Sequence, residues 1–425
     1  MMIAIFFFSL ILFLFLSVPI ATSLGIATVI GLSLGETLPL TSVPQRIFVS
    51  LNSFPLMAIP FFILAGVIMQ AGGMSRRLVN FATSLVGHAT GGLAMVAIIT
   101  SLFFAAISGS GAATTAAIGS ILIPAMIAKG YDIGYASANQ AVSGSLGVII
   151  PPSIPLILYG VSAQTSVGDM FLAGIFPGLL ITISLLITAY IISKKRGYHG
   201  VERKNVTEIW SSFKGAFWAI LMPIIVLGGI YAGVFTPTEA SVIAVVYSLI
   251  VGLLIYREIK LKEIMKILEN SAITTSVIMI IIGTAGLFSF FVSMVGIPDL
   301  IANFITNFTT NSIIFLLLIN LILLLAGTVL DATAAILIFV PLLLPIALSF
   351  GIDPVHFGII MVINLSIGYI TPPVGINLFV AAKISNMKIV DISKAILPFL
   401  LILIINLMII TYLPTLSTWL PSLMK

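Results

Sequence analysis

The chain has 425 residues, of which 60% are hydrophobic and only 7% are charged, and its formal net charge is +5. So few charged side chains could not cover the surface of a water-soluble protein of this length, which excludes that class. The small positive charge gathers in loops and gives no basic surface for nucleic acid. The lack of cysteine excludes disulfides and thiolate metal sites. The composition predicts an all-α polytopic membrane protein in contact with the lipid bilayer.

Apolar runs long enough to span a hydrocarbon core begin at the N-terminus and recur along the chain. Clear examples are residues 2–18, 172–192, 273–294 and 397–413. The first run has no basic segment before it and leads directly into further apolar sequence. We therefore interpret it as a first span rather than as a cleaved signal.

Two basic segments, residues 193–214 and 256–266, flank a pair of apolar runs. Two spans return the chain to the side it left, so both segments share one side, which the positive-inside rule predicts to be cytoplasmic. The corresponding loop of the first half, residues 35–53, carries Arg46 as its single basic residue. This asymmetry indicates that the two halves insert in opposite orientations, with the N-terminus outside. Residues 259–270 have an apolar face and predict a separate helix lying along the membrane surface.

A repeated pattern joins the two halves. Residues 124–152 read PAMIAKGYDIGYASANQAVSGSLGVIIPP, and residues 345–373 read PIALSFGIDPVHFGIIMVINLSIGYITPP. A constant offset aligns the two blocks without a gap and superimposes their Pro-Pro pairs. We predict two inverted repeats, residues 1–210 and 211–425. Two halves that each carry a Gly- and Pro-interrupted apolar segment are typical of a secondary transporter, whose substrate and ions bind where the interrupted segments meet.

Each repeat contains a segment that predicts a re-entrant helical hairpin, near residues 108–130 in the first repeat and near residues 329–350 in the second. In the first, a Ser- and Gly-rich stretch precedes only about a dozen apolar residues, too few to cross a bilayer. The simplest solution is a hairpin that enters the membrane and leaves by the same side. Non-helical backbone at that depth must lie inside protein or beside water.

Asp331 occupies the second predicted hairpin, between apolar stretches on both sides. An ionised carboxylate at such depth is costly unless it has a partner, and no Lys or Arg lies nearby in the sequence. A bound cation is one natural partner. A second interpretation is a cap on the N-terminus of a half-helix, and the two are compatible.

A broken helix follows each hairpin, near residues 133–165 and near residues 354–385. Consecutive prolines remove two N–H donors and force the preceding residue out of the α region. Upstream carbonyls then lose their helical partners, and together with hydroxyls they form an all-oxygen shell suited to Na⁺. The half-helix that begins after Pro152 or Pro373 presents a positive dipole end to an anion.

Two other functions fit the sequence less well. A channel needs a continuous polar pore, whereas this chain has two discrete interrupted sites. An intramembrane enzyme needs paired acids or a Ser/His/Asp set at depth, and Asp331 stands there alone. There is no nucleotide-binding or hydrolase motif, so neither ATP hydrolysis nor an organic cofactor has support.

Across essentially its whole length the chain resembles the large membrane subunit of tripartite ATP-independent periplasmic (TRAP) transporters. The resemblance is carried by SFPLMAIPFF at residues 53–62, MSRRL at 74–78, SGS at 108–110, IIPPS at 149–153, PTEA at 237–240 and TPPVG at 371–375. It implies an inverted-repeat elevator fold with no enzymatic activity, in the bacterial inner membrane, which puts the N-terminus in the periplasm. It also implies two partners, a small four-helix membrane subunit and a periplasmic substrate-binding protein.

The resemblance further implies sodium-coupled secondary active import of an organic acid, with two or more Na⁺ ions. By motif position the sodium sites fall on Ser108, Gly109, Gly144, Gly147, Ile150, Gly327, Asp331, Gly368 and Thr371. For the substrate we predict contacts from Ser110, Pro152, Ser153, Thr333 and Pro373. The predicted transport unit comprises residues 104–158 and 326–379, and the remaining helices form a scaffold.

The substrate is a sialic acid or a C4-dicarboxylate, and general likeness along the chain leans towards a sialic acid. The predicted site contains no basic residue from which the number of carboxylates on the substrate could be inferred. Within transport, coupling to protons through Asp331 is the alternative to sodium.

Overall fold

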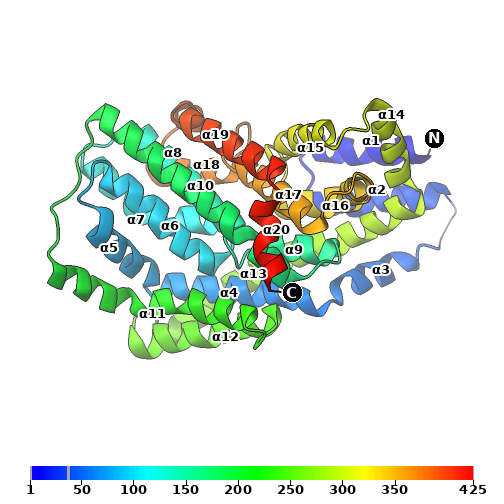
Figure 1. Ribbon diagram of the computed structural model, residues 1–425. Helices are drawn as coiled ribbons and strands as arrows, with labels where there is room; N and C mark the ends of the chain where they lie inside the picture. The colour runs from blue at the N-terminus through cyan, green and yellow to red at the C-terminus, as the bar shows by residue number, and fades with distance from the viewer. Residues whose placement is uncertain (1, 36–38, 425) are drawn as a thin grey trace.

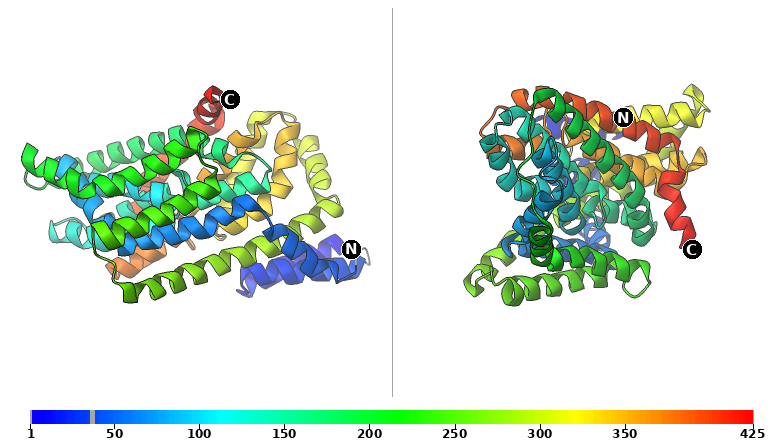
Figure 2. Two further views of the ribbon diagram at one scale, coloured as in Figure 1. Left: turned by 90° about the horizontal axis from the view of Figure 1, so that it is seen from below. Right: turned by 60° about the vertical axis from the view of Figure 1, so that its left-hand side comes forward.

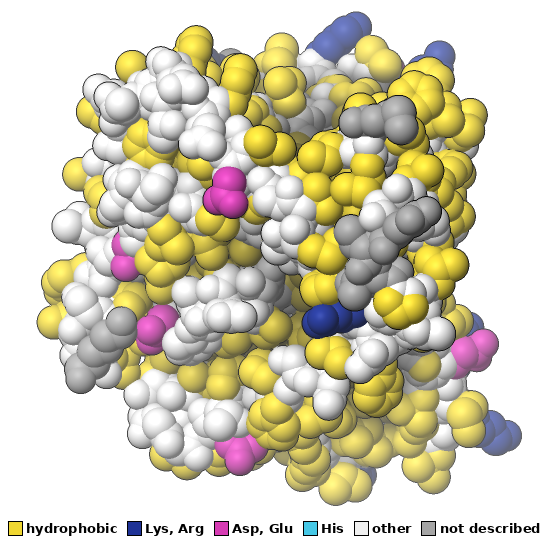
Figure 3. Space-filling view, turned by 90° about the vertical axis from the view of Figure 1, so that its right-hand side faces the viewer, with side chains coloured by type: hydrophobic (Ala, Val, Ile, Leu, Met, Phe, Trp, Pro, Cys, Tyr) yellow, Lys and Arg dark blue, Asp and Glu magenta, His cyan; other side chains and the backbone are white. Residues whose placement is uncertain are grey.

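The computed structural model describes residues 2–35 and 39–424, and the regular elements in this part are all helices. Nine helices within the described ranges are long and apolar enough to cross a membrane. Hydrophobic side chains cover much of the face in Figure 3, and the charged ones on it are scattered. The prediction of an all-α polytopic membrane protein is confirmed.

The first half of the chain folds into eleven helical elements, shown from blue to green in Figure 1. They are α1 (Met2–Phe15), α2 (Ile20–Gly35), α3 (Ser42–Leu51), the short η1 (Phe54–Met57), α4 (Ala58–Ala71), α5 (Met74–Val86), α6 (Gly92–Ser108), α7 (Gly111–Ala128), α8 (Ile133–Ile149), α9 (Ile154–Ser162) and α10 (Val167–Arg196).

The second half repeats this order and adds a C-terminal helix. It comprises α11 (Val206–Tyr231), α12 (Pro237–Ile250), the π-helical η2 (Val251–Ile255), α13 (Leu261–Met294), α14 (Ile297–Phe308), α15 (Ser312–Gly327), α16 (Ala332–Ser349), α17 (Pro354–Gly368), α18 (Ile376–Ser385), α19 (Ile389–Tyr412) and α20 (Thr415–Leu423).

One element differs between the halves. The first half has α3, η1 and α4 where the second has the single 34-residue helix α13, the long helix in the left view of Figure 2. The break in the first half falls where Ser53 is extended and Pro55 cannot donate a backbone hydrogen bond. The prediction of a separate surface helix at residues 259–270 is wrong, because residues 261–270 form the first turns of α13.

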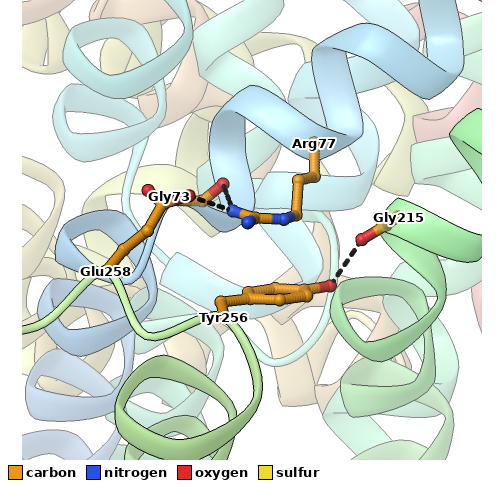
Figure 4. A network of polar contacts seen from close by, with 5 residues as sticks. All are labelled: Gly73, Arg77, Gly215, Tyr256 and Glu258. Atoms are coloured by element: carbon orange, nitrogen blue, oxygen red, sulfur yellow. Dashed lines mark hydrogen bonds and ion pairs between the residues drawn. The ribbon is translucent and has the colours of Figure 1, made fainter.

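The two halves interlock. Helix α4 packs against α12, α5 against α11, and α2 against α13. One polar network of this interface is drawn in Figure 4. Nη1 of Arg77 on α5 donates to Glu258 Oε1 at 2.5 Å and to Gly73 O at 3.2 Å. Its guanidinium carbon lies 3.8 Å from the centroid of the Tyr256 ring, whose hydroxyl donates to Gly215 O at 2.7 Å.

The centre of the molecule is formed by α8 and α17, whose residues are buried from Gly134 to Ile149 and from Val355 to Gly368. They lie beside the helix pairs α6–α7 and α15–α16. The predicted hairpin segments, near residues 108–130 and 329–350, coincide with α7 and α16 alone, so the turn of each pair lies at the start of its segment and not inside it. The predicted shortness of the second helix in each pair is wrong. Helices α7 and α16 have 18 residues each, about 27 Å, because Ser110 and Asp331 cap new helices immediately after the turns.

Candidate functional site

A cavity of about 460 Å³ lies where the tips of both helix pairs meet helix α13. The tips of both helix pairs, the broken segments and α13 all contribute to its wall. The lining residues are Gly109, Ser110, Gly111, Val148, Ile154, Pro155, Ile273, Thr274, Val277, Ile278, Ile281, Asp331, Thr333 and Tyr369. Three helices begin at this wall, α7, α9 and α16, so their positive dipole ends gather around the cavity.

Asp331 is held at the rim by two hydrogen bonds. Its Oδ2 accepts from the backbone N–H of Thr333 at 2.9 Å, which makes it the N-cap of α16. Its Oδ1 accepts from the Tyr369 hydroxyl at 2.6 Å. Each oxygen thus keeps acceptor capacity for a further ligand. Asp331 is the acidic residue among those that line the cavity, and none of the described lining residues is basic.

The same wall carries the equivalent residues of the first repeat in a different chemical form. Ser110 aligns with Asp331 and caps α7, where its hydroxyl accepts from the N–H of Ala113 at 3.4 Å. Val148 aligns with Tyr369. A Cβ placed on Gly111 would lie 3.1 Å from both Val148 and Tyr369, so the two repeats meet at this glycine. One repeat therefore supplies a carboxylate and a phenol where the other supplies a hydroxyl and an apolar side chain.

Around Ser108 in the first repeat, backbone and hydroxyl oxygens come close together. The hydroxyls of Ser108 and Thr114 are 2.9 Å apart, and Thr114 donates to Ser110 O at 2.8 Å. A Cβ on Gly147 would lie 2.5 Å from Ser110 O. A Cβ on Gly144 would lie 1.8 Å from Thr115 Oγ1. Both glycines of α8 thus admit oxygen atoms of α7 to the helix surface, which a larger side chain would exclude.

The second repeat has a closer backbone contact at the corresponding place. A Cβ on Gly368 would lie 2.3 Å from the carbonyl carbon and oxygen of Gly327. Thr371 turns its hydroxyl back to Ile367 O at 2.7 Å. The predicted sodium residues of this repeat therefore surround the point where α15 ends against α17.

The broken segments contact the tips of the helix pairs. The N–H of Ile154 donates to Gly109 O at 3.3 Å, and a Cβ on Gly109 would lie 2.9 Å from Pro152 O. In the second repeat the N–H of Val374 donates to Thr328 O at 3.3 Å. The Pro151-Pro152 and Pro372-Pro373 peptide bonds are both cis. Each break is thus fixed to the turn of its own repeat.

The predicted site residues fall into three groups. Four of them line the cavity itself, namely Gly109, Ser110, Asp331 and Thr333. Eight lie at the contacts around it, namely Ser108, Gly144, Gly147, Pro152, Ser153, Gly327, Gly368 and Thr371. The remaining two lie apart from its lining. Ile150 packs on Gly178 of α10, and Pro373 is exposed.

Sequence reasoning missed several polar groups at this centre. Tyr369 was not predicted, because a tyrosine within apolar sequence is usually a core residue. Its alignment with Val148 nevertheless indicates a change of chemistry between the repeats. Asn377 on α18 is fully buried, and its Nδ2 donates to Ala141 O on α8 at 3.1 Å. Thr114 and Thr115 are buried on α7, and Thr274 of α13 lines the cavity.

Comparison with known proteins places this geometry in a family. The family model of the "tripartite ATP-independent periplasmic transporter, DctM component" matches residues 7–416. The chain is 48% identical to the isethionate TRAP transporter permease protein DctMQ of Oleidesulfovibrio alaskensis over 95% of the chain, but it spans only 64% of that relative. It is 42% identical to the C4-dicarboxylate TRAP transporter large permease protein DctM of Pseudomonas aeruginosa, over 94% of each.

The fold also resembles a solved transporter of low sequence identity. The crystal structure of the Alcanivorax borkumensis YdaH transporter matches with a TM-score of 0.66 at 16% identity, covering 92% of this chain and 89% of that one. This likeness concerns the arrangement of the helices alone.

Proposed function

The chain belongs to the DctM family of tripartite ATP-independent periplasmic transporters, and on that premise we propose that it imports a small organic anion together with Na⁺. It is a permease and not an enzyme. We further propose that it works in the bacterial inner membrane with a small membrane subunit, expected to have four helices, and with a periplasmic protein that delivers the substrate.

The observation that carries this proposal is the pairing of chemistries at the cavity. Three helix N-termini favour an anion there, while Asp331 and the oxygen-rich contacts behind Ser108 and Gly327 favour hard cations. Among the described lining residues there is no basic side chain to balance a bound anion, and no acidic side chain besides Asp331 to balance bound cations. Cation and anion therefore neutralise each other when both are bound, which is the physical basis of coupled uptake.

The arrangement of the helices supports the proposed orientation. The N-terminus lies at the opposite end of the molecule from the connection between α10 and α11 (Figure 1). That end carries Lys194, Lys195 and Arg196 in the last turn of α10, and Arg203 and Lys204 in the connection. With the basic end in the cytoplasm, the N-terminus is periplasmic. In the same frame, we propose that α6–α7 and α15–α16 are re-entrant hairpins and that residues 104–158 and 326–379 cross the membrane as one transport unit.

The substrate remains a choice among anions. The sequence alone leans towards a sialic acid, whereas the relatives described above carry isethionate and C4-dicarboxylate in their names. We propose that the substrate is a small carboxylate or sulfonate. Isethionate is the first compound to test, because the chain is 48% identical to the isethionate TRAP transporter permease protein.

The test is uptake into proteoliposomes that contain the complex of this chain with its small subunit, with the binding protein added outside. Isethionate, succinate and N-acetylneuraminic acid are offered in turn under an inward Na⁺ gradient, a proton gradient alone, or neither. Uptake of one compound under the Na⁺ gradient alone is expected. Equal uptake in Na⁺-free buffer with a proton gradient would establish proton coupling through Asp331, for which its hydrogen bond to Tyr369 offers a partner.

A second arm omits the binding protein and the small subunit. Liposomes that contain this chain alone are expected to stay nearly empty, because none of its described elements forms a soluble domain that could capture substrate. Robust uptake in that minimal system would contradict the tripartite proposal while leaving ion coupling open to the first arm.

A further inference from the structure

A second cavity of about 510 Å³ lies next to the candidate site along α13. Three helices line both cavities in the same order. From the first cavity to the second, α9 contributes Ile154 and then Leu158, α16 contributes Thr333 and then Leu337, and α13 contributes residues 273–281 and then residues 282–293. The two cavities are thus consecutive compartments between the proposed transport unit and the scaffold.

The second cavity has a chemistry opposite to that of the first. Arg46 of α3 lines it, together with Ser162, Gln164, Ser289 and Ser293, and no carboxylate is among its described lining residues. No described carboxylate lies within ion-pair distance of Arg46 either. A cation that has no counter-charge among the described residues, beside several hydroxyls, is the donor set that a carboxylate or sulfonate binds.

Arg46 is exposed, and it stacks on α13 where that helix packs closely against α3. Its guanidinium carbon lies 3.8 Å from the centroid of the Phe290 ring on α13. One turn further along α3, Ser50 meets Gly286, where a Cβ would lie 2.0 Å from Ser50 Oγ. Stacking on Phe290 covers one face of the guanidinium and leaves its N–H edge for hydrogen bonds. The group is therefore pre-positioned by a contact that does not consume its donors.

The second cavity also lies towards one end of the molecule. Helix α13 begins within the basic segment at residues 256–266. Its line of contact with the cavities runs from Thr274 to Phe290, about 24 Å along the axis. The cavity around Arg46 is nearer the end of α13 away from that basic segment, which the positive-inside rule assigns to the periplasm.

From these observations, and resting on the proposed function, we propose that the Arg46 cavity is a second anion-binding site. It receives the carboxylate or sulfonate of the substrate on the periplasmic side, before that group reaches the cavity at Ser110 and Asp331. Ile281 lines the first cavity, and Ile282 and Leu337 line the second, so apolar side chains lie where the two compartments adjoin. Movement of α9 and α16 along α13 carries the inner site towards Arg46.

The test uses cysteine labelling, because the native chain has no cysteine. Ser289→Cys places a thiol in the Arg46 cavity of the purified complex, and the rate of maleimide modification is measured against increasing isethionate, succinate or N-acetylneuraminic acid. At least one of these probes is expected to slow labelling. Combining Ser289→Cys with Arg46→Gln should raise the probe concentration for half protection by about tenfold or more, since a hydrogen bond to a charged group is lost.

Two matched variants separate charge recognition from altered folding. Arg46→Lys keeps the charge and should restore part of the protection, while Arg76→Gln removes an arginine on α5 outside both cavities and should change nothing. Thermal unfolding checks that all variants are folded. In uptake assays Arg46→Gln should raise KM for external substrate more than it lowers the maximal rate.

The proposal fails if no probe slows maleimide labelling of Ser289→Cys. It also fails if the probes protect the Ser289→Cys, Arg46→Gln double variant as well as they protect Ser289→Cys alone. Failure of the proposed function gives a different result, because wild-type complex then takes up none of the probes under a Na⁺ gradient. The labelling arm needs no transport, so it decides the Arg46 site in either case.

Discussion

Tyr369 donates its hydroxyl to Asp331 across 2.6 Å, and the aligned pair in the other repeat is Val148 and Ser110. All four residues line one cavity. The two repeats thus share a backbone plan but differ in chemistry at one point, where a carboxylate with a phenol partner replaces a hydroxyl beside an apolar side chain. This difference makes the site at Asp331 chemically distinct from the site at Ser110, although the two arise from the same repeated backbone pattern.

Replacing Asp331 by Asn is expected to lower sodium-coupled uptake by at least about tenfold. The amide can still cap α16, because Asn is as good an N-cap as Asp, so folding should be preserved while the charge that attracts the cation is lost. Uptake at several Na⁺ concentrations and thermal unfolding measure the two effects. Ser110→Ala is the matched control in the other repeat and should lose less activity. Normal coupled uptake by Asp331→Asn would reduce Asp331 to a helix cap.

Tyr369→Phe removes the hydroxyl that holds Asp331 Oδ1 but leaves the ring against Gly111. We expect the Na⁺ concentration for half-maximal uptake to change, because the carboxylate loses one of its two hydrogen-bond donors. The melting temperature should fall, because the buried N–H of Ala332 loses the Tyr369 hydroxyl as its acceptor at 3.3 Å. An unaltered Na⁺ dependence would mean that the phenol positions no cation ligand.

Gly368→Ala should destabilise the protein by about 1–3 kcal/mol, the usual cost of forcing extra volume into a packed interior. The new Cβ would lie 2.3 Å from the backbone of Gly327, which has no flexible side chain to move aside. Thermal unfolding in detergent checks this. Gly228→Ala provides the comparison, since a Cβ there meets no atom within 4 Å. Equal melting temperatures of the two variants would show that α15 and α17 are further apart than described here.

Arg77→Ala should lower the free energy of unfolding by about 1–2 kcal/mol, from the lost stacking on Tyr256 and the half-buried ion pair with Glu258. Arg76→Ala is the matched control, because it removes an arginine at the preceding position of α5 that lies outside this network. Arg77→Lys should recover only part of the loss, because an ammonium does not stack as a guanidinium does. If Arg76→Ala proves as costly as Arg77→Ala, the network contributes nothing specific.

Movement of the transport unit is tested by distances between spin labels at introduced cysteines. Lys129 belongs to the proposed transport unit and Arg257 to the scaffold, and both are exposed. Their separation should differ between Na⁺- and substrate-loaded protein and Na⁺-free protein. The separation between Lys129 and Leu348, both in the transport unit, should stay constant. A fixed Lys129–Arg257 distance would replace the elevator with local gating.

Much of this centre could be predicted because its signals are local in the sequence. A Pro-Pro pair breaks a helix wherever it occurs, and a carboxylate in apolar sequence is conspicuous without knowledge of the fold. The interaction of Asp331 with Tyr369 could not be predicted, since it joins two helices and a buried tyrosine is ordinary in a core. Arg46 read as a loop charge because its stack on Phe290 depends on how α3 meets α13.

Two errors about helix lengths have physical causes. The polar start of α13 read as a surface segment, yet a helix can extend beyond the apolar layer with its charged turns in water. The small residues after Ser110 read as a turn, but a capping hydroxyl begins a helix at once, and Ala, Gly and Thr continue it when neighbouring helices pack against them.

The interlocking of the halves constrains how the protein is made. Helices α4 and α5 leave the ribosome well before α12 and α11, the helices against which they pack. In that interval the faces of α4 and α5 that later pack on α12 and α11 are unpartnered, so the first half cannot reach its final packing when its own synthesis ends. The Arg77–Glu258 contact forms only when the chain has been translated past η2. Final folding therefore depends on retaining the early helices, in the bilayer or by the insertion machinery, until the later ones arrive.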